Sequence, residues 1–309
     1  MNSMTGANDK TGANCAGLSL SSSIAACMKA RRTMLVPGAA NALSARIIAD
    51  LGFEAVYVTG AGITNIDFGL PDLGFLSLPQ LTEQTAAIRD AVTLPLIVDA
   101  DTGFGNAVNV HHTVRVLERA GANAIQIEDQ VFPKRCGHFA GKELISMGEM
   151  RGKIHAAVDA RSTQELLIIA RTDARAVEGF QAAVDRAFVS IEAGADVTFV
   201  EAPESVEEMR RIPQLLQLPQ VANMVIGGST PIVGASDLSE MGFAIALYAN
   251  VALQGAILGM QNVLRELKKR GSIEENSGLL AAFTERQRLV QKPMCDELER
   301  RYASKDQPK

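Results

Sequence analysis

Short runs of apolar and β-branched residues alternate along the chain with longer stretches in which apolar residues recur at helical spacing. Runs that are apolar throughout are typical of parallel strands buried on both faces. The predicted strands are residues 33–36, 55–58, 94–98, 122–127, 166–170, 196–200, 220–223 and 243–247. The segments between them predict helices, among them residues 42–51, 81–92, 106–120, 180–193 and 205–215. Eight such units predict an α/β fold of the (β/α)8 TIM-barrel type rather than an open doubly wound sheet.

Both ends of the chain depart from this repeat. Residues 1–20, rich in Gly, Asn and Ser, predict a disordered tail, and a helix is expected from about residue 21 to residue 32. The sequence ending at Cys27 faintly resembles a lipoprotein cleavage site, but the weakly apolar, Ser-rich segment before it makes a poor signal peptide. Residues 251–270 and 278–302 are helical and amphipathic. We therefore expect residues 21–309 to form one barrel domain with a C-terminal helical extension.

Composition excludes several classes of function. The chain has 309 residues, of which 47% are apolar, and a net charge of −5, so no basic surface favours nucleic acid or an anionic membrane. No apolar run approaches the ~20 residues of a membrane span. The four cysteines, Cys15, Cys27, Cys136 and Cys295, form neither a metal-binding pair nor a disulfide framework, which favours a cytoplasmic location.

Polar and charged residues gather at the ends of the predicted strands. These residues are Tyr57, Thr59, Asp99, Asp101, Glu128, Arg171, Asp173, Glu201 and Asn223. In a barrel, the carboxyl ends of all the strands meet on the face where active sites are found. Any one of these residues could be a helix cap or a solvated charge, but so many strand ends predict a functional site.

An oxygen-rich set of acidic residues predicts a metal site. Asp72, Asp99, Asp101 and Glu128 offer carboxylates, with no histidine or cysteine at ligand spacing. Such ligands suit Mg2+, with Mn2+ as the alternative. Asp101 could instead form a turn before Gly103, and Asp72 could do the same in its loop.

The segment from Glu128 to Lys142 carries the most specific chemistry. It places Cys136 among Lys134, Arg135 and His138, and nearby positive charge favours the thiolate form of a cysteine. Glycines at 137 and 141 leave this loop flexible enough to open and close. Carboxylates for a hard metal, a tuned thiol and a mobile loop indicate an enzyme that acts on a small anionic substrate. The alternative is a solvated basic loop with an incidental cysteine.

Two further elements are suited to binding an anion. The planar fork of Arg171 can form two parallel hydrogen bonds with a carboxylate. Thr59, Gly60 and Ala61 follow a strand where a tight turn can direct backbone N–H groups at an anion. A dinucleotide site is rejected there, because the third glycine and the downstream acid are missing.

Several short motifs occur in the order found in the isocitrate lyase and phosphoenolpyruvate mutase superfamily. They are VYVTG (56–60), GLPDLG (69–74), VDADTGFG (98–105), EDQ with KRCGH (128–138), ARTDARA (170–176), FVEAP (199–203) and ANM (222–224). The resemblance runs from about residue 34 to residue 302. The FVEAP and ANMVIGGSTP segments look most like the branch of 2,3-dimethylmalate lyase and the petal-death protein.

The resemblance implies roles for individual residues. Asp99 would contact Mg2+ directly, and Asp101, Glu128 and Asp72 mostly through water. Tyr57 would lie near the substrate hydroxyl, while Arg171 and the 59–61 turn would hold a carboxylate. Cys136 would be the general acid, tuned by His138, Lys134 and Arg135, and Gly137, Glu201 and Asn223 would border the substrate. The family's barrels exchange their last helix between subunits, so a homotetramer built as a dimer of dimers is expected. A helix folded back on its own barrel is the alternative.

Two departures from the family narrow the range of expected substrates. Gln126 stands where methylisocitrate and isocitrate lyases usually carry histidine, and residues 224–229 (MVIGGS) lack polar groups for a further carboxylated arm. We therefore expect a Mg2+-dependent lyase that cleaves a 2-hydroxy dicarboxylate resembling 2,3-dimethylmalate to pyruvate and a short acid. The alternatives are an oxaloacetate hydrolase or decarboxylase, a methylisocitrate lyase and, more remotely, a non-catalytic barrel that binds a metal or an effector.

Overall fold

Eight parallel strands form the centre of the molecule in the computed structural model, which describes residues 19–137, 141–275 and 277–303. The strands are β1 (Met34–Ala39), β2 (Val56–Val58), β3 (Leu96–Asp99), β4 (Ala124–Glu128), β5 (Leu167–Thr172), β6 (Val197–Val200), β7 (Val221–Asn223) and β8 (Ile245–Tyr248). Each overlaps a predicted apolar run. The continuous hydrophobicity of these runs reflects burial on both faces, as expected for parallel strands.

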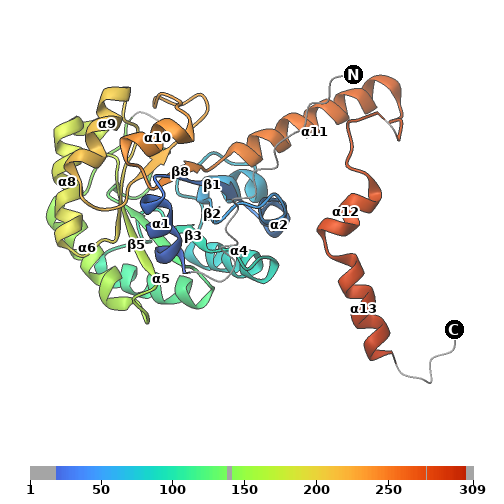
Figure 1. Cartoon of the computed structure of the whole chain (residues 1–309), viewed down its shortest axis with the longest axis horizontal. Coiled ribbons are helices and arrows are strands. Elements are labelled where there is room, and N and C mark those ends of the chain that lie inside the picture. The colour runs from blue at the N-terminus through green and yellow to red at the C-terminus, as the bar shows by residue number, and fades with distance from the viewer. Residues whose placement is uncertain (1–18, 138–140, 276, 304–309) are drawn as a thin grey trace, which may run out of the picture.

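The strands close into a barrel. Their order is β6-β5-β4-β3-β2-β1-β8-β7, and a parallel bridge between Thr198 and Gln220 joins the two outermost strands. Helices surround the strands (Figure 1). The predicted (β/α)8 class is therefore confirmed.

Residues 278–302, predicted as one helical run, contain two helices. The other helices match the predicted ranges to within about three residues where a range was predicted, and several had no predicted range. The helices are α1 (Leu20–Lys29), α2 (Ala42–Asp50), α3 (Gly60–Ile63), the π-helix η1 (Thr64–Phe68), α4 (Leu78–Ala91), α5 (Ala107–Arg119), α6 (Met147–Ala160), α7 (Arg175–Glu178), α8 (Phe180–Glu192), α9 (Val206–Leu215), α10 (Ala235–Met241), α11 (Val251–Arg270), α12 (Phe283–Leu289) and α13 (Lys292–Tyr302). Side-chain caps set several of the starts. Asn106, for example, accepts hydrogen bonds from the N–H groups of Val108 and Asn109.

The core has two layers. Inside the barrel, side chains such as Tyr57, Ile97 and Phe199 fill the space between the strands. Outside it, the opposite faces of the strands pack against the helices. Leu20 and Ile24 of α1 belong to the inner layer, so α1 closes the amino-terminal end of the barrel. The functional residues are consequently confined to the carboxyl end.

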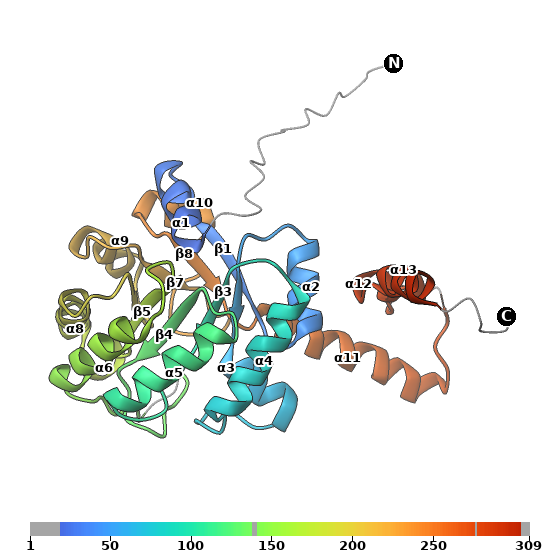
Figure 2. The same cartoon turned by 90° about the horizontal axis from the view of Figure 1, so that it is seen from below.

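The C-terminal helices leave the barrel. Helix α11 begins just after β8, has no buried residue and runs outward, as Figures 1 and 2 show. Helix α12 touches α2, where Arg288 forms two hydrogen bonds of 2.6 and 2.7 Å with the Asp50 carboxylate. The extension is therefore helical, as predicted, but α11 does not fold back over its own barrel.

His138 and residues 1–18 of the predicted tail lie outside the described part of the chain. Residues 19 and 20 of that predicted tail are described, and they form the N-cap and the first residue of α1. Across the helices of the described residues, none combines the length and hydrophobicity needed to cross a bilayer.

Candidate active site

Strand register brings the predicted polar residues together at the carboxyl end of the barrel. Glu128 on β4 is the register partner of Arg171 on β5, and Asp99 on β3 is the partner of Gln126 on β4. Neighbouring parallel strands lie about 4.8 Å apart, so paired residues are within reach of one another. The convergence expected from the strand ends is therefore present in the fold.

A hydrogen-bonded chain links Tyr57 to the predicted metal ligand Asp99. The Tyr57 hydroxyl donates to Gln126 Oε1 at 2.9 Å, and Gln126 Nε2 donates to Asp99 Oδ1 at 3.2 Å. Burial, reinforced by the negative charge of Asp99, raises the pKa of Tyr57 well above its usual value. Tyr57 is thus a neutral donor at physiological pH. Gln126, which the sequence marked only as a departure from the family, is the residue that orients it.

Asp99 and Asp101 flank the backbone of Gly60. A Cβ built on Gly60 would lie 3.5 Å from Asp101 Oδ1 and 3.7 Å from Asp99 Oδ2. Asp101 adopts a left-handed conformation with φ of 48° and is only 5% exposed. Asp tolerates this conformation better than most residues. Asp101 therefore has the backbone conformation of the turn former that its sequence offered as one alternative, and its role as a metal ligand stays a prediction.

Lys134 neutralises part of this acidic cluster. Its Nζ lies 2.5 Å from Asp72 Oδ1 and 2.9 Å from Asp101 Oδ1, and the residue is 4% exposed. Burial alone would lower the pKa of Lys134, but the surrounding carboxylates raise it well above its usual value. The structure thus places this ammonium on two predicted metal ligands, whereas the sequence predicted that it tunes the Cys136 thiol.

Arg171 is the second buried cation of the site. Its Nε and Nη2 each donate to the Asp173 carboxylate at 3.0 Å, and Nε lies 3.3 Å from Glu128 and 3.8 Å from Glu201. The guanidinium also lies 5.2 Å from the centre of the Phe199 ring. Burial opposes the charge, but these carboxylates raise the pKa of Arg171 well above its usual value. Since Asp173 binds one edge of the Arg171 guanidinium, a substrate carboxylate would bind the other edge.

The loop that carries Cys136 lies directly against Arg171 and Glu201. A Cβ on Gly137 would come within 2.5 Å of Arg171 Nη2 and 2.7 Å of Glu201 Cγ, so any larger residue would have to displace these side chains. Glu201 also accepts hydrogen bonds of 3.1 and 3.3 Å from Asn223 Nδ2. The structure therefore brings Gly137, Arg171, Glu201 and Asn223 into one group beside the cysteine.

The predicted turn at residues 59–61 opens a short helix. Thr59 is the N-cap of α3, and its hydroxyl accepts a hydrogen bond from the Gly62 N–H at 3.1 Å. The same hydroxyl donates to Asn250 Oδ1 at 3.3 Å. Backbone N–H groups in a first helical turn have no partner within the helix, which keeps the predicted anion-binding role consistent with this geometry.

The acidic cluster fits a divalent cation that retains water. Glu128 Oε1 is buried without a hydrogen-bond partner, and burial raises the pKa of Glu128 well above its usual value and that of Asp101 to about 7. A bound cation would favour the ionised forms. Within the described residues, no three His, Cys, Asp or Glu side chains form a complete ligand set. Mg2+ does not require one, because it is commonly held by one or two carboxylates and several waters.

Sequence reasoning missed the residues that support the site. Asp129 is fully buried, accepts from the Thr172 hydroxyl at 2.7 Å and the Asp173 N–H at 2.9 Å, and lies 3.3 Å from Arg186 Nη1. Gln130 and Lys142 contact the backbone on either side of Cys136. The available signal was their place in the segment 128–142, which carries the cysteine.

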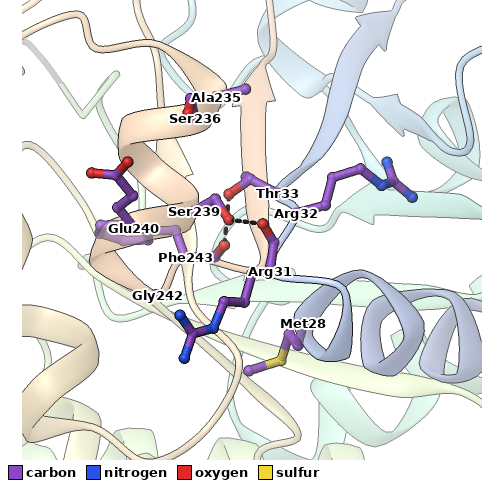
Figure 3. A pocket seen from close by; sticks show the side chains of 10 residues that line it. All are labelled: Met28, Arg31, Arg32, Thr33, Ala235, Ser236, Ser239, Glu240, Gly242 and Phe243. Carbon is purple, nitrogen blue, oxygen red and sulfur yellow. Dashed lines mark hydrogen bonds between the residues drawn. The ribbon is translucent and has the colours of Figure 1, made fainter. Parts of the chain in front are cut away.

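A cavity of about 770 Å3 is lined by none of the predicted site residues. Figure 3 shows it between the end of α1 and helix α10, where Thr33 donates to the Phe243 carbonyl at 2.9 Å. Residues 33 and 243 precede β1 and β8, so this cavity lies at the amino-terminal end of the barrel. Barrel enzymes carry their chemistry at the other end, and we place the candidate active site there.

Known proteins with the same organisation are similar over most of the chain. It is 41% identical over 277 residues to 2,3-dimethylmalate lyase of Eubacterium barkeri, which covers 90% of this chain and 96% of the relative. It is 46% identical over 255 residues to 2-methylisocitrate lyase of Aeropyrum pernix, which covers 82% of each.

Solved structures agree with the sequence relatives. The trigonal crystal form of 2,3-dimethylmalate lyase superposes with a TM-score of 0.84 at 32% identity, covering 92% of this chain and 96% of the other. Oxaloacetate acetylhydrolase in complex with 3,3-difluorooxalacetate superposes with a TM-score of 0.84 at 30% identity, covering 90% of this chain and 94% of the other. Phosphonopyruvate hydrolase in complex with oxalate and Mg2+ superposes with a TM-score of 0.81 at 31% identity, covering 92% of this chain and 99% of the other. The family profile of phosphoenolpyruvate phosphomutase matches residues 24–268, and the chain belongs to this enzyme family of the PEP mutase/isocitrate lyase superfamily.

Proposed function

We propose that the chain is a Mg2+-dependent carbon–carbon lyase that cleaves a 2-hydroxy dicarboxylate such as 2,3-dimethylmalate into pyruvate and propionate. The observation that carries the proposal is the close approach of the Cys136–Gly137 backbone to Arg171 and Glu201, next to the acidic cluster. A proton donor, a carboxylate-binding cation and oxygen ligands for a metal then surround one small substrate. The similarity to named lyases supports the same class of reaction.

Each residue has a role in the proposed cleavage. Arg171 binds the carboxylate next to the hydroxyl-bearing carbon, and Tyr57, held by Gln126, orients the hydroxyl. Loss of the hydroxyl proton, for which the buried carboxylates are the available bases, forms the carbonyl of pyruvate as the C2–C3 bond breaks. The electron pair stays on the departing acid as an enediolate, and the Cys136 thiol delivers a proton to its carbon. Glu201 and Asn223 border the departing arm.

Asp99 would hold the metal directly, with Asp101, Glu128 and Asp72 acting mostly through water. When bound, Mg2+ would stabilise negative charge on the substrate oxygens. Lys134 limits the charge of this cluster because it pairs with both Asp72 and Asp101. The Mg2+ of phosphonopyruvate hydrolase supports the choice of ion.

Two other reactions compete with this proposal. The 46% identity to a 2-methylisocitrate lyase favours a tricarboxylate substrate, but residues 224–229 contain no charged side chain to bind the extra carboxylate. The similarity to oxaloacetate acetylhydrolase favours hydrolysis of oxaloacetate. Product analysis separates the three, because only the proposed reaction yields pyruvate and propionate.

We further propose that the enzyme is a cytoplasmic homotetramer in which α11 packs against the barrel of a second copy. Apolar side chains of α11, among them Leu258, Met260 and Leu264, are 59%, 54% and 59% exposed. Apolar side chains on α12 and α13, Phe283 and Met294 among them, are exposed as well. So large an apolar area on one extension favours a partner, and a second copy of the same chain would bury it.

Substrate choice is the central test of the proposed function. We expect kcat/KM for 2,3-dimethylmalate to exceed that for 2-methylisocitrate by ~10²-fold or more, because an unpaired carboxylate in a closed site costs several kcal/mol. Pyruvate, propionate, succinate, oxalate and CO2 would be measured with Mg2+ present. Equal turnover of 2-methylisocitrate would reject the substrate, and release of oxalate from oxaloacetate alone would reject the reaction.

Metal removal should abolish activity. After chelation with EDTA, we expect turnover to be lost and then restored by Mg2+ or Mn2+. Calorimetric titration should show that Asp99→Ala loses most of its Mg2+ binding, whereas Asp185→Ala, which removes an exposed carboxylate on α8, keeps it. Full activity of the chelated protein would contradict the metal assignment.

Replacement of the thiol should slow turnover without unfolding the protein. Because a hydroxyl is a much poorer proton donor, Cys136→Ser should lower kcat by ~10²–10⁴-fold. Mg2+ affinity and the melting temperature should remain those of the wild type. Cys295→Ser, which changes an exposed cysteine on α13, is the matched control. A normal kcat in Cys136→Ser would remove the cysteine from the mechanism.

Charge on α11 should dissociate the assembly. We expect the intact chain to sediment as a tetramer and Leu258→Glu/Leu264→Glu to sediment as a smaller species, because buried carboxylates would oppose the contact. Val108→Glu, at a 77% exposed position of α5, should leave the tetramer intact. A monomeric wild-type protein at micromolar concentration would refute the proposed exchange of helices.

A further inference from the structure

The backbone next to Cys136 is held by a side chain with no role in the reaction proposed above. Gln130 Oε1 accepts a hydrogen bond from the Arg135 N–H at 2.9 Å, and Gln130 Nε2 donates to the Arg135 carbonyl at 2.8 Å. Gln130 is only 1% exposed. The side-chain amide of Gln130 therefore bonds both the backbone N–H and the backbone carbonyl of Arg135, the residue before Cys136. This arrangement fixes the position of the Arg135 backbone.

A second side chain holds the residue after the thiol. Lys142 Nζ donates to the Gly137 carbonyl and lies 3.4 Å from Asp173 Oδ1, and Lys142 is 7% exposed. Asp173 is also the carboxylate that orients the Arg171 fork. Lys142 thus connects the backbone beside Cys136 to the residue that aligns the substrate-binding arginine.

Both contacts are anchored to the barrel. Gln130 follows the end of β4 by two residues and forms an antiparallel bridge with Leu144. Two further backbone hydrogen bonds, Val131 N–H to the Glu143 carbonyl at 2.8 Å and Ile145 N–H to the Asp129 carbonyl at 2.9 Å, join the same two segments. The ribbon that carries Gln130 and Lys142 is therefore a continuation of the strand that presents Glu128.

On the side that faces Arg171 and Glu201, the thiol segment has little room to shift. The Gly137 backbone lies so close to Arg171 and Glu201 that even a Cβ would come within 2.5 Å of the guanidinium. A displacement of about 1 Å in a reacting group can cost ~10²-fold in rate. Small movements of residues 135–137 should therefore matter for proton transfer from Cys136.

We propose that Gln130 and Lys142 are positioning residues that together clamp the Arg135–Gly137 backbone and so place the Cys136 thiol beside Arg171 for proton transfer. The inference rests on the proposed lyase function, to which it adds two residues that act through the thiol. Gln130 holds the backbone of the residue before the cysteine. Lys142 holds the backbone of the residue after it and also contacts the Asp173 carboxylate.

The first test compares variants that remove the clamp but preserve side-chain size. Gln130→Met should lower kcat by ~10–100-fold with KM changed by less than about threefold, because positioning acts on the chemical step. Lys142→Met should lower kcat by a similar factor and also raise KM, because Lys142 contacts the Asp173 carboxylate that aligns Arg171. Lys142→Arg retains a cationic donor and should recover most of the loss. Gln220→Met deletes another buried glutamine bonded to a backbone carbonyl, at 2.9 Å and before β7, and should keep wild-type kcat. Equal losses in Lys142→Arg and Lys142→Met, or an unchanged kcat in Gln130→Met, would overturn the proposal.

A double-mutant cycle separates positioning of the thiol from general support of the fold. If Gln130 acts through Cys136, Gln130→Met should cost less than about threefold in kcat when added to Cys136→Ser, since the group that it positions is already gone. A loss of ~10–100-fold in both backgrounds would show that Gln130 acts by another route.

Hydrogen exchange tests the clamp without any substrate. In Gln130→Met, the Arg135 amide should exchange at least about tenfold faster, while the amides of the barrel strands keep their protection. This measurement keeps the two proposals distinguishable. Absence of turnover of every diacid by the wild-type enzyme would refute the lyase, and the exchange of Arg135 would then decide the clamp by itself. An unchanged exchange rate would refute it.

Discussion

Burial of charge at the carboxyl end of the barrel is the constraint on which the site depends. Ionised groups removed from water are costly unless they are paired. Three cations meet this requirement: Lys134 is shared by Asp72 and Asp101, Arg171 by Asp173, Glu128 and Glu201, and Lys142 also lies beside Asp173. The number of acids exceeds the number of cations, which leaves a net negative cluster. A divalent metal and an anionic substrate together would restore the balance.

The end of β4 organises the rest of the site. Successive side chains of an extended segment point to opposite sides, so Glu128 faces Arg171, Asp129 faces the backbone of Asp173, and Gln130 reaches the thiol loop. Three consecutive residues therefore support three different parts of the site. This arrangement connects the acidic cluster, the arginine and the cysteine loop to one rigid strand, and it explains how a loop residue can be placed with the accuracy of a barrel residue.

Residues particular to this chain refine a shared framework. Gln126 occupies the position between Tyr57 and Asp99, where an amide donates to one partner and accepts from the other. Unlike a histidine, an amide does not change its protonation state near neutral pH. The donor and the acceptor of this link therefore stay the same across the physiological pH range. The segment after Asn223, residues 224–229, carries no charged side chain and so offers no cation to an additional carboxylate.

The sequence by itself determined the barrel, because eight apolar runs followed by polar residues depend only on local burial and chain direction. It also indicated four candidate site residues: Asp99, Glu128 and Arg171, because each lies at a strand end, and Cys136, because it lies among cationic residues. Tertiary structure alone decided which groups pair. Asp72 and Lys134 are separated by 62 positions, and nothing local to either predicts their 2.5 Å contact. The contacts of Gln130 and Lys142 depend on how the loop returns to β4, and the local pattern of α11 does not set its outward course. Such choices are set by packing between distant segments, which periodicity does not encode.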